Sequence, residues 1–221
     1  MPGPRKKIRL HCGRTMRAKK LLNPVMLLVT ILPGFKSAPQ EVFGQGGISD
    51  SSSFNEAVLE THNEYRQMHH SQHMDLDPKL TEEAQNYAKE LSIRGISLLR
   101  HSRGYKEKKY GENIYAICDR HVLPIDPVKN WYSKVCLYDF LAHAAKSKAV
   151  PVKEFTQVVW RGTEKLGVGR ATSHLGKPCT YIVARYLPRH DPAVRRTNVD
   201  IGDFNKEICN DSRYVGFGAR G

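Results

Sequence analysis

Residues 166–172 read "LGVGRAT", and residues 180–188 read "TYIVARYLP". Both runs contain many β-branched residues, which favour extended backbone. Between them lies Gly176-Lys177-Pro178, and glycine and proline are typical of turns. The pattern therefore predicts two antiparallel strands joined as a hairpin. Because this hairpin comes after the predicted helices, it decides the fold class.

Upstream of the hairpin, apolar residues recur at the spacing of helices. The first helix is predicted to start at Ser53, whose hydroxyl can cap the helix while Glu56 reaches back to the cap. The second is predicted to start at Thr81 and to end near Gly95, a residue typical of helix C-caps. The expected inward residues of these two helices are Phe54, Val58, Leu59, His62, Tyr65, Ala84, Tyr87, Ala88 and Leu91.

A third helix is predicted with Pro127 in its first turn and with Trp131, Val135 and Tyr138 on one face. Residues 113–117, "NIYAI", alternate weakly and predict a strand or an extended segment. The chain loses apolar periodicity after the hairpin, which predicts a loose tail. Helices first and strands last indicate one α+β domain, in which helices pack on a small, mainly antiparallel sheet.

The formal net charge of +13 would be typical of a nucleic-acid binder if it were spread over the domain. However, nine of the 35 Lys and Arg residues lie within residues 1–36, which contain no acid. Residues 37–221 therefore hold 26 basic against 22 acidic residues, a net charge of only +4. Nucleic acid is not expected as a partner.

The basic N-terminus has another explanation. A short apolar stretch, "VMLLVTIL" at residues 25–32, follows the basic run and precedes small residues. It is too short to cross a bilayer, so we interpret residues 1–38 as a secretory signal peptide. Met16 is an alternative start that gives a leader of ordinary length, and a mitochondrial presequence is the rival interpretation. Residues 39–52, rich in Gly, Ser and Gln, are predicted to be a linker.

The cysteine content agrees with secretion. Removing the leader takes away Cys12 and leaves four cysteines, namely Cys118, Cys136, Cys179 and Cys209. Four cysteines allow three pairings, and the sequence does not choose among them. The chain has no CxxC pair, so a structural zinc knuckle is not expected.

Two clusters of polar residues have both a functional and an ordinary interpretation. His69, His70 and His73 include an i, i+4 pair that could bind a metal, but surface histidines at a helix end are the favoured interpretation. The basic loop at residues 100–109 could touch acidic polysaccharide or lipid head groups, whereas a solvated loop is the simpler account. Its cations are Arg100, Arg103, Lys106, Lys108 and Lys109.

His101 and Glu112 lie on the two sides of this loop. An imidazole and a carboxylate brought together could act in acid–base or metal chemistry. Charged loop residues are common, however, and the spacing alone does not separate the two interpretations. The chain has no GxSxG motif, so nothing indicates a serine nucleophile of that type.

Eight stretches of the sequence together resemble the CAP superfamily, which comprises cysteine-rich secretory proteins, antigen 5 and pathogenesis-related 1 proteins. They are "HNEYR" (62–66), "LTEEAQNYAKEL" (80–91), "HS" (101–102), "YGENIY" (110–115), "WYSKV" (131–135), "EFTQVVW" (154–160), "LGVGRA" (166–171) and "YIVARYLP" (181–188). The match is to the short, single-domain members of the Golgi-associated type. It implies a three-layer α-β-α sandwich over residues 53–190, followed by a loose tail at residues 191–221.

The resemblance also implies a cleft lined by two histidines and two acids. His101 and Glu112 match the first histidine and the first acid. At the positions of the second acid and the second histidine this chain has Lys134 and Glu154, which can pair if they line the same cleft. The ordinary alternative is that both face solvent. His101, Glu112 and Glu154 would be weak metal ligands beside an ammonium group, so little or no zinc binding is expected.

This half-lost tetrad favours a secreted, extracellular protein that acts by binding rather than by catalysis. The resemblance implies a lipid, a sterol, an acidic glycan or a protein as partner, and some short members form homodimers. A hydrolase that uses His101 and Glu112 as an acid–base pair is the alternative function. Association of the basic loop with a membrane surface is a third hypothesis.

Overall fold

The computed structural model describes residues 50–149, 151–173 and 176–210. The predicted leader, residues 39–49 of the predicted linker and residues 211–221 of the predicted tail lie outside this part of the chain. No helix within the described ranges is both long enough and apolar enough to cross a membrane.

The main helices are α1 (Asp50–Met68), α2 (Pro78–Arg94), α4 (Ile125–Tyr132) and α5 (Lys153–Val158). The strands are β1 (Asp75–Leu76), β2 (Gly111–Cys118), β3 (Tyr138–Asp139), β4 (Ala144–Ala145), β5 (Lys165–Ser173) and β6 (Cys179–Leu187). Short helical turns complete the described chain: η1 (Ile96–Leu98), α3 (Arg103–Lys106), η2 (Ser133–Leu137), η3 (Pro192–Val194), α6 (Arg195–Asn198) and η4 (Lys206–Asn210).

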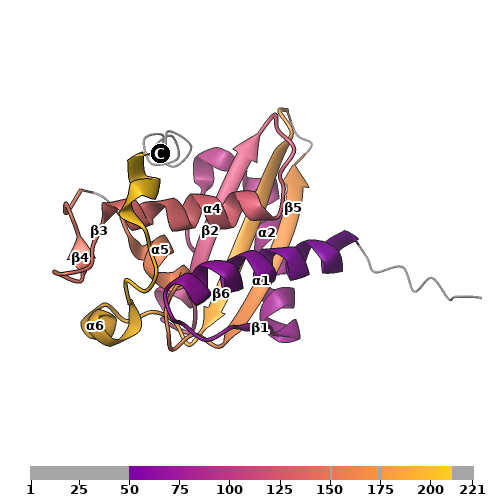
Figure 1. Ribbon diagram of the computed structural model, residues 1–221. Coiled ribbons are helices and arrows are strands. Elements are labelled where there is room, and N and C mark those ends of the chain that lie inside the picture. The colour runs from indigo at the N-terminus through magenta and orange to yellow at the C-terminus, as the bar shows by residue number, and fades with distance from the viewer. Residues whose placement is uncertain (1–49, 150, 174–175, 211–221) are drawn as a thin grey trace, which may run out of the picture. The chain divides into compact units, whose positions relative to one another are not determined.

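The predicted hairpin forms the centre of the main sheet. Strands β5 and β6 pair antiparallel, and the sheet has the order β1-β5-β6-β2. Only β1 runs parallel to its neighbour, so the sheet is mainly antiparallel, as predicted. Figure 1 shows α2 on one face of the sheet and α1, α4 and α5 on the other. The predicted three-layer α-β-α sandwich is therefore confirmed.

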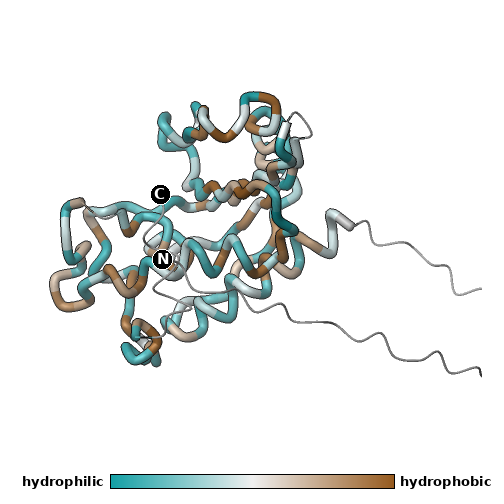
Figure 2. The backbone as a smooth tube through the Cα atoms, turned by 90° about the horizontal axis from the view of Figure 1, so that it is seen from above, coloured by the Kyte–Doolittle hydropathy of each residue, from teal (hydrophilic) through white to brown (hydrophobic). Residues whose placement is uncertain are grey.

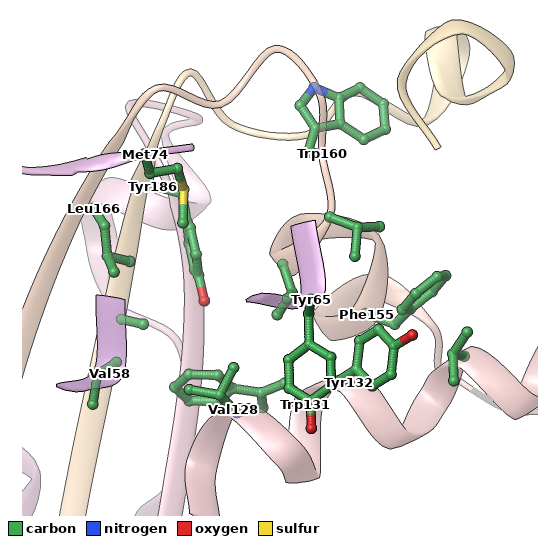
Figure 3. Close-up of a cluster of buried hydrophobic side chains, with 14 of the residues drawn as sticks. Val58, Tyr65, Met74, Val128, Trp131, Tyr132, Phe155, Trp160, Leu166 and Tyr186 are labelled. Carbon is green, nitrogen blue, oxygen red and sulfur yellow. The ribbon is translucent and has the colours of Figure 1, made fainter. Parts of the chain in front are cut away.

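Alternate residues of β6 fill the two interfaces of the sandwich, because successive side chains of a strand point to opposite faces. Tyr181 and Val183 belong to the cluster under α2, whereas Ile182 and Tyr186 belong to the larger cluster under the other helices. Figure 3 shows part of this larger cluster, in which Trp131 and Phe155 are labelled. Along the helices, Figure 2 shows hydrophilic and hydrophobic segments alternating, as expected for elements with one buried side.

The glycines of "LGVG" have a specific role in this packing. A Cβ atom at Gly167 would overlap the backbone of α2 at Leu80 and Thr81, and one at Gly169 would overlap the backbone at Ala84 and Gln85. Helix α2 therefore lies directly against β5, closer than a strand with side chains at these positions would allow. This contact explains two glycines in a strand, where glycine is otherwise unfavourable.

The helix boundaries differ from the prediction for local reasons. Helix α1 begins at Asp50, so part of the predicted linker is helical, and the hydroxyl of Ser52 rather than Ser53 bonds to Glu56. Helix α2 begins at Pro78 because Asp77 caps it, accepting a hydrogen bond of 2.7 Å from the backbone N–H of Leu80.

The third helix, α4, is shorter than predicted. It ends at Tyr132, and the chain continues as a 3-10 turn and then as strand β3. Trp131, Val135 and Tyr138 are all buried, but only Trp131 belongs to the helix. The apolar spacing predicted burial correctly, since a 3-10 turn keeps a similar period.

The structure corrects the prediction of a loose tail after residue 190. The described part, residues 191–210, folds back onto the domain and contributes Val199 and Phe204 to the larger core cluster. A disulfide joins Cys209 to Cys136, and a second joins Cys118 to Cys179 across the paired strands β2 and β6. The segment lacks periodicity because it consists of single-turn helices separated by irregular backbone.

Candidate functional site

Three of the four predicted cleft residues line one cavity. His101, Glu112 and Glu154 surround a space of about 320 Å³, which we call the tetrad cleft. Its remaining lining residues are Tyr105, Asn113, Pro151, Lys153, Gln157 and His190. Lys134 lies in η2 and is not part of this lining, so its expected ion pair with Glu154 remains a prediction.

Glu112 begins the paired region of β2 and is fully enclosed. Its Oε1 accepts from Nδ1 of His101 at 3.1 Å and from the backbone N–H of Ser102 at 2.8 Å. Its Oε2 accepts from the hydroxyl of Ser102 at 2.6 Å and from Nε of Arg185 at 3.3 Å. Burial works to raise the pKa of Glu112, but these hydrogen bonds and the positive charge of Arg185 outweigh it, so the pKa lies below its usual value. The carboxylate is held ionised with its lone pairs occupied.

His101 presents its other edge to the cleft. The imidazole stacks on the ring of Tyr105 with centroids 3.9 Å apart, and the guanidinium of Arg189 lies 5.3 Å from the same tyrosine ring. The side chain of His101 is 41% exposed. Glu112 therefore orients an imidazole that remains accessible to solvent.

Glu154 lies in the first turn of α5, at the border of the apolar run "FTQVVW". Its backbone carbonyl accepts a hydrogen bond of 3.1 Å from the side-chain amide of Asn113, which ties α5 to β2. Its Oε2 is buried and has no hydrogen-bond partner among the described residues. The charge at the edge of this apolar stretch is thus a cleft residue rather than a solvated border residue.

The cleft contains a second histidine that the sequence analysis missed. His190 follows β6 and is only 3% exposed, with its backbone N–H bonded to the side chain of Gln157 at 2.9 Å. Burial, with smaller effects from the nearby cations, lowers the pKa of His190 to about 4. It was missed because it lies where periodicity ends. Its position directly after the block "YIVARYLP" was the one available signal.

The comparison with known proteins agrees with this geometry. The family model for the cysteine-rich secretory protein family, CAP, matches residues 59–186. The chain belongs to the CAP family. Golgi-associated plant pathogenesis-related protein 1 of Homo sapiens is 36% identical over 143 residues, which is 64% of this chain and 87% of the relative.

Two further matches extend the comparison. Secreted protein RBT4 of Candida albicans is 31% identical over 142 residues, covering 64% of this chain but only 36% of that longer protein. The crystal structure of Na-ASP-1 matches with a TM-score of 0.50 and 18% identity, over 78% of this chain and 46% of that one. This structural likeness concerns the fold alone.

The donor set of the tetrad cleft fits a zinc ion poorly. A metal site needs several ligand atoms with available lone pairs, and both oxygens of Glu112 already accept hydrogen bonds. Within the described ranges, no group of three or more His, Cys, Asp or Glu side chains is arranged to hold a metal ion. Weak zinc binding therefore stays a prediction, and we derive no chemistry through a metal.

We expect the double substitution Lys134→Glu and Glu154→His to increase zinc affinity by at least about tenfold, because it restores the acid and the imidazole of the family pattern. Isothermal titration with zinc, wild type against the double variant, measures this. The substitution His73→Ala, at an exposed residue outside the cleft, is the control. Equal zinc affinity for wild type and the double variant would show that these positions do not form the family-type site.

The histidine cluster at the end of α1 does not form a metal site. His70 and His73 are exposed, as predicted for a helix end, but the expectation of a surface position is wrong for His69. His69 is fully buried, with Nδ1 at 2.6 Å from the carbonyl of Asp200 and Nε2 at 2.9 Å from the hydroxyl of Tyr132. It anchors the C-terminal segment to the core.

The basic loop lines a broad groove of about 650 Å³ beside the tetrad cleft, and His101 contributes to both. The five cations of the loop are exposed, as predicted. Several cations of this groove are neutralised, since Arg94 pairs with Glu90 and Arg103 pairs with Glu107. Arg185 at the base is shared between Glu83 and Glu112.

A third cavity of about 790 Å³ lies between the segment that carries β3 and β4 and the C-terminal segment. Figure 1 shows these two segments on the same side of the domain. We call it the disulfide pocket because Cys136 and Cys209 line it. Its apolar lining residues are Val135, Tyr138, Phe140, Leu141, Val199, Ile201 and Phe204, and its charged or polar ones are Asp139, His143, Lys146, Arg196, Asp200, Lys206 and Asn210.

Proposed function

We propose that this CAP-family protein acts by binding and that its ligand is an amphipathic lipid held in the disulfide pocket. The observation that carries the proposal is the combination of apolar walls and a cationic rim in a cavity of about 790 Å³. Ligand pockets of proteins commonly enclose roughly 300–1,000 Å³, with mostly apolar walls and a few polar groups that orient the ligand.

The exposure of apolar side chains supports this choice. Leu141 is 91% exposed and Ile201 is 40% exposed, and both line the pocket. Exposed apolar residues that gather at a concave surface are typical of a binding site, whereas scattered ones are ordinary. Burial of these side chains against a hydrocarbon chain would contribute about 25 cal/mol for each Å² of apolar surface removed from water.

An acidic glycan has less support. The groove beside the basic loop offers cations, but the ion pairs of Arg94, Arg103 and Arg185 already satisfy much of that charge. A highly charged ligand would have to compete with carboxylates at each of these positions. The lipid proposal requires no ion pair to break.

Secretion forms part of the proposal. Two disulfides lie within the described domain, and structural disulfides persist in oxidising compartments. Among the relatives, one is named a secreted protein and another is named Golgi-associated, and both names refer to the secretory route. We therefore propose an extracellular location, reached with the N-terminal leader that the sequence predicts.

The alternative of a hydrolase lacks a suitable base and nucleophile in the tetrad cleft. Glu112 has a lowered pKa and accepts four hydrogen bonds, so it is a weak proton acceptor. The adjacent hydroxyl of Ser102 is buried and donates to Glu112, which leaves it without a base that could activate it. A binding role makes no such demand.

Filling the disulfide pocket tests the proposal. We expect delipidated wild-type protein to bind single-chain lipids in native mass spectrometry and in titrations followed by tryptophan fluorescence. The substitution Ile201→Trp should weaken that binding at least about tenfold, because the indole occupies volume that the ligand needs. Leu98→Trp is the matched control, since Leu98 is an exposed apolar residue that does not line this pocket.

Two outcomes contradict the proposal. The first is that no single-chain lipid binds the wild-type protein at micromolar concentrations. The second is that Ile201→Trp and Leu98→Trp bind the lipid equally well, which would place the ligand elsewhere on the molecule. A leader that directs no protein into the medium of expressing cells would remove the extracellular location but not the binding site.

A further inference from the structure

Buried polar atoms without a partner gather at one end of the disulfide pocket. Within the described residues, the buried side-chain atoms that lack any hydrogen-bond partner include Oη of Tyr138, Nδ1 of His143 and Nε of Arg195. Tyr138 and His143 line the pocket, and Arg195 directly precedes the lining residue Arg196. Buried polar groups are almost always satisfied in folded proteins, so a group of unsatisfied atoms beside a cavity calls for a ligand that satisfies them.

Tyr138 is the best defined of these groups. It is only 2% exposed, and its ring packs against Phe140 at 5.0 Å and against Phe155 at 5.4 Å between centroids. The aromatic neighbours fix the direction of the phenol, so the hydroxyl cannot turn away to reach water. A phenylalanine would fill the same space without leaving a buried hydroxyl unsatisfied.

The charge of Arg195 reaches this hydroxyl. Burial raises the pKa of Tyr138 to about 12, and the positive charge of Arg195 opposes that rise. The phenol is therefore a neutral O–H donor at physiological pH, with a guanidinium close to it. Two donors, the phenol O–H and the guanidinium Nε–H, are available to one acceptor group.

We infer that the disulfide pocket recognises a long-chain carboxylate, with the carboxylate accepting hydrogen bonds from Tyr138 and Arg195 and the hydrocarbon chain lying along the apolar wall. This inference rests on the proposed lipid-binding function and names the head group that the site selects. A carboxylate is an acceptor with about four lone-pair directions, which matches a site made of donors.

The two acids on the lining do not oppose such a ligand strongly. Asp139 accepts from the backbone N–H groups of Leu141 and Ala142, at 2.9 Å and 3.1 Å. Asp200 pairs with Arg161 at 3.1 Å. The cations of the rim are Lys146, Arg196 and Lys206. The cations outnumber the acids, and both acids already have partners, so the pocket favours a negative head group.

Head-group chemistry separates this inference from lipid binding in general. Delipidated protein is titrated with myristate, myristyl alcohol and methyl myristate, which share one hydrocarbon chain. We expect wild-type protein to prefer myristate by about tenfold or more, since hydrogen bonds to a charged group are stronger than those to a neutral one. Arg195→Met and Tyr138→Phe should each remove most of this preference while leaving the affinity for the alcohol within about twofold.

The stability of the empty protein provides a second measurement. Because the hydroxyl of Tyr138 has no partner, Tyr138→Phe should leave the melting temperature of the delipidated protein unchanged or raise it. Tyr181→Phe, at a buried tyrosine on the other face of the sheet, is the control for ligand binding. A purely structural role for the hydroxyl of Tyr138 would instead lower the melting temperature and leave the head-group preference intact.

The possible results are distinguishable. If none of the three amphiphiles binds, the proposed function fails. If all three bind equally and Ile201→Trp weakens them all, the lipid site stands and the carboxylate inference is overturned. If myristate is preferred but Tyr138→Phe and Arg195→Met keep that preference, another part of the pocket selects the head group and this assignment is wrong.

Discussion

Replacing Arg66 with methionine should lower the free energy of unfolding by about 4 kcal/mol, the range observed when one partner of a buried charge network is removed. Arg66 lies near the end of α1 and is fully buried. Burial lowers the pKa of its guanidinium only to about 10, so the side chain remains charged at neutral pH.

The guanidinium is satisfied entirely by backbone carbonyls in the hydrogen bonds that the structure gives. Its Nε donates to Gln72 at 2.8 Å, one terminal nitrogen donates to Val158 at 3.1 Å and Trp160 at 2.8 Å, and the other donates to Thr163 at 2.7 Å. Methionine fills a similar volume but donates nothing, so four buried carbonyls lose a donor. Three of them belong to the chain that joins α5 to β5, so the loss should also loosen the helix that carries Glu154.

Equilibrium unfolding in urea measures this difference directly. Arg94→Met is the matched control, because Arg94 forms an i, i+4 pair with Glu90 on the surface of α2, and such pairs contribute about 0.3–0.5 kcal/mol. Arg66→Lys should fall between the two, since an ammonium cannot donate along four fixed directions. An Arg66→Met variant as stable as the Arg94→Met control would mean that water or rearranged backbone satisfies the carbonyls without a guanidinium.

The sequence predicts those parts of the fold that repeat. The inward faces of α1 and α2 and the β5–β6 hairpin follow from periods of 3.6 and 2, because burial of one face imposes the period on the sequence. The start of α2 was misplaced because Thr81 and Asp77 are both good capping residues, and the choice depends on Pro78 in the first turn. The C-terminal segment was missed because Val199, Phe204 and Cys209 anchor it singly, at spacings that follow no period.

The candidate site shows the same division. His101, Glu112 and Glu154 were predicted to share a cleft, and the structure brings them together. His190 was missed because a buried polar residue in irregular backbone leaves no pattern in the sequence. The unsatisfied hydroxyl of Tyr138 was also beyond prediction. The apolar spacing predicted the burial of its ring correctly, but only the packing shows that the oxygen meets no partner.

Acid should destabilise the protein over the range from about pH 6.5 to about pH 4, chiefly through buried histidines. His62 is fully buried, and burial lowers its pKa to about 4, with a smaller effect from the charge of Arg66. A hydrogen bond to the carbonyl of Val58 opposes this decrease in pKa. The unfolded chain therefore binds a proton at pH 6.5 and below, whereas the folded state resists protonation until about pH 4.

The sign follows from that difference. Above the unfolded value of 6.5 both states of His62 are neutral, and the full stability is present. As the pH falls toward 4, the unfolded state gains protons first, and the free energy of unfolding falls by about 3 kcal/mol for this one group. His190, with a pKa also lowered to about 4, acts over the same range. Glu112 adds a further loss only at lower pH, where its own lowered pKa is crossed.

Urea unfolding at a series of pH values tests this account through a slope rather than an absolute stability. His62→Gln keeps a side chain that can bond to the hydroxyl of Tyr186, which Nε2 of His62 contacts at 2.9 Å, but it removes the titrating group. Between pH 6.5 and pH 4 its free energy of unfolding should fall by about 3 kcal/mol less than that of wild type. His73→Gln, at an exposed histidine, should keep the wild-type slope. If the slopes of His62→Gln and wild type coincide, the imidazole of His62 takes up its proton equally in the folded and unfolded states, and its burial does not control the response to acid.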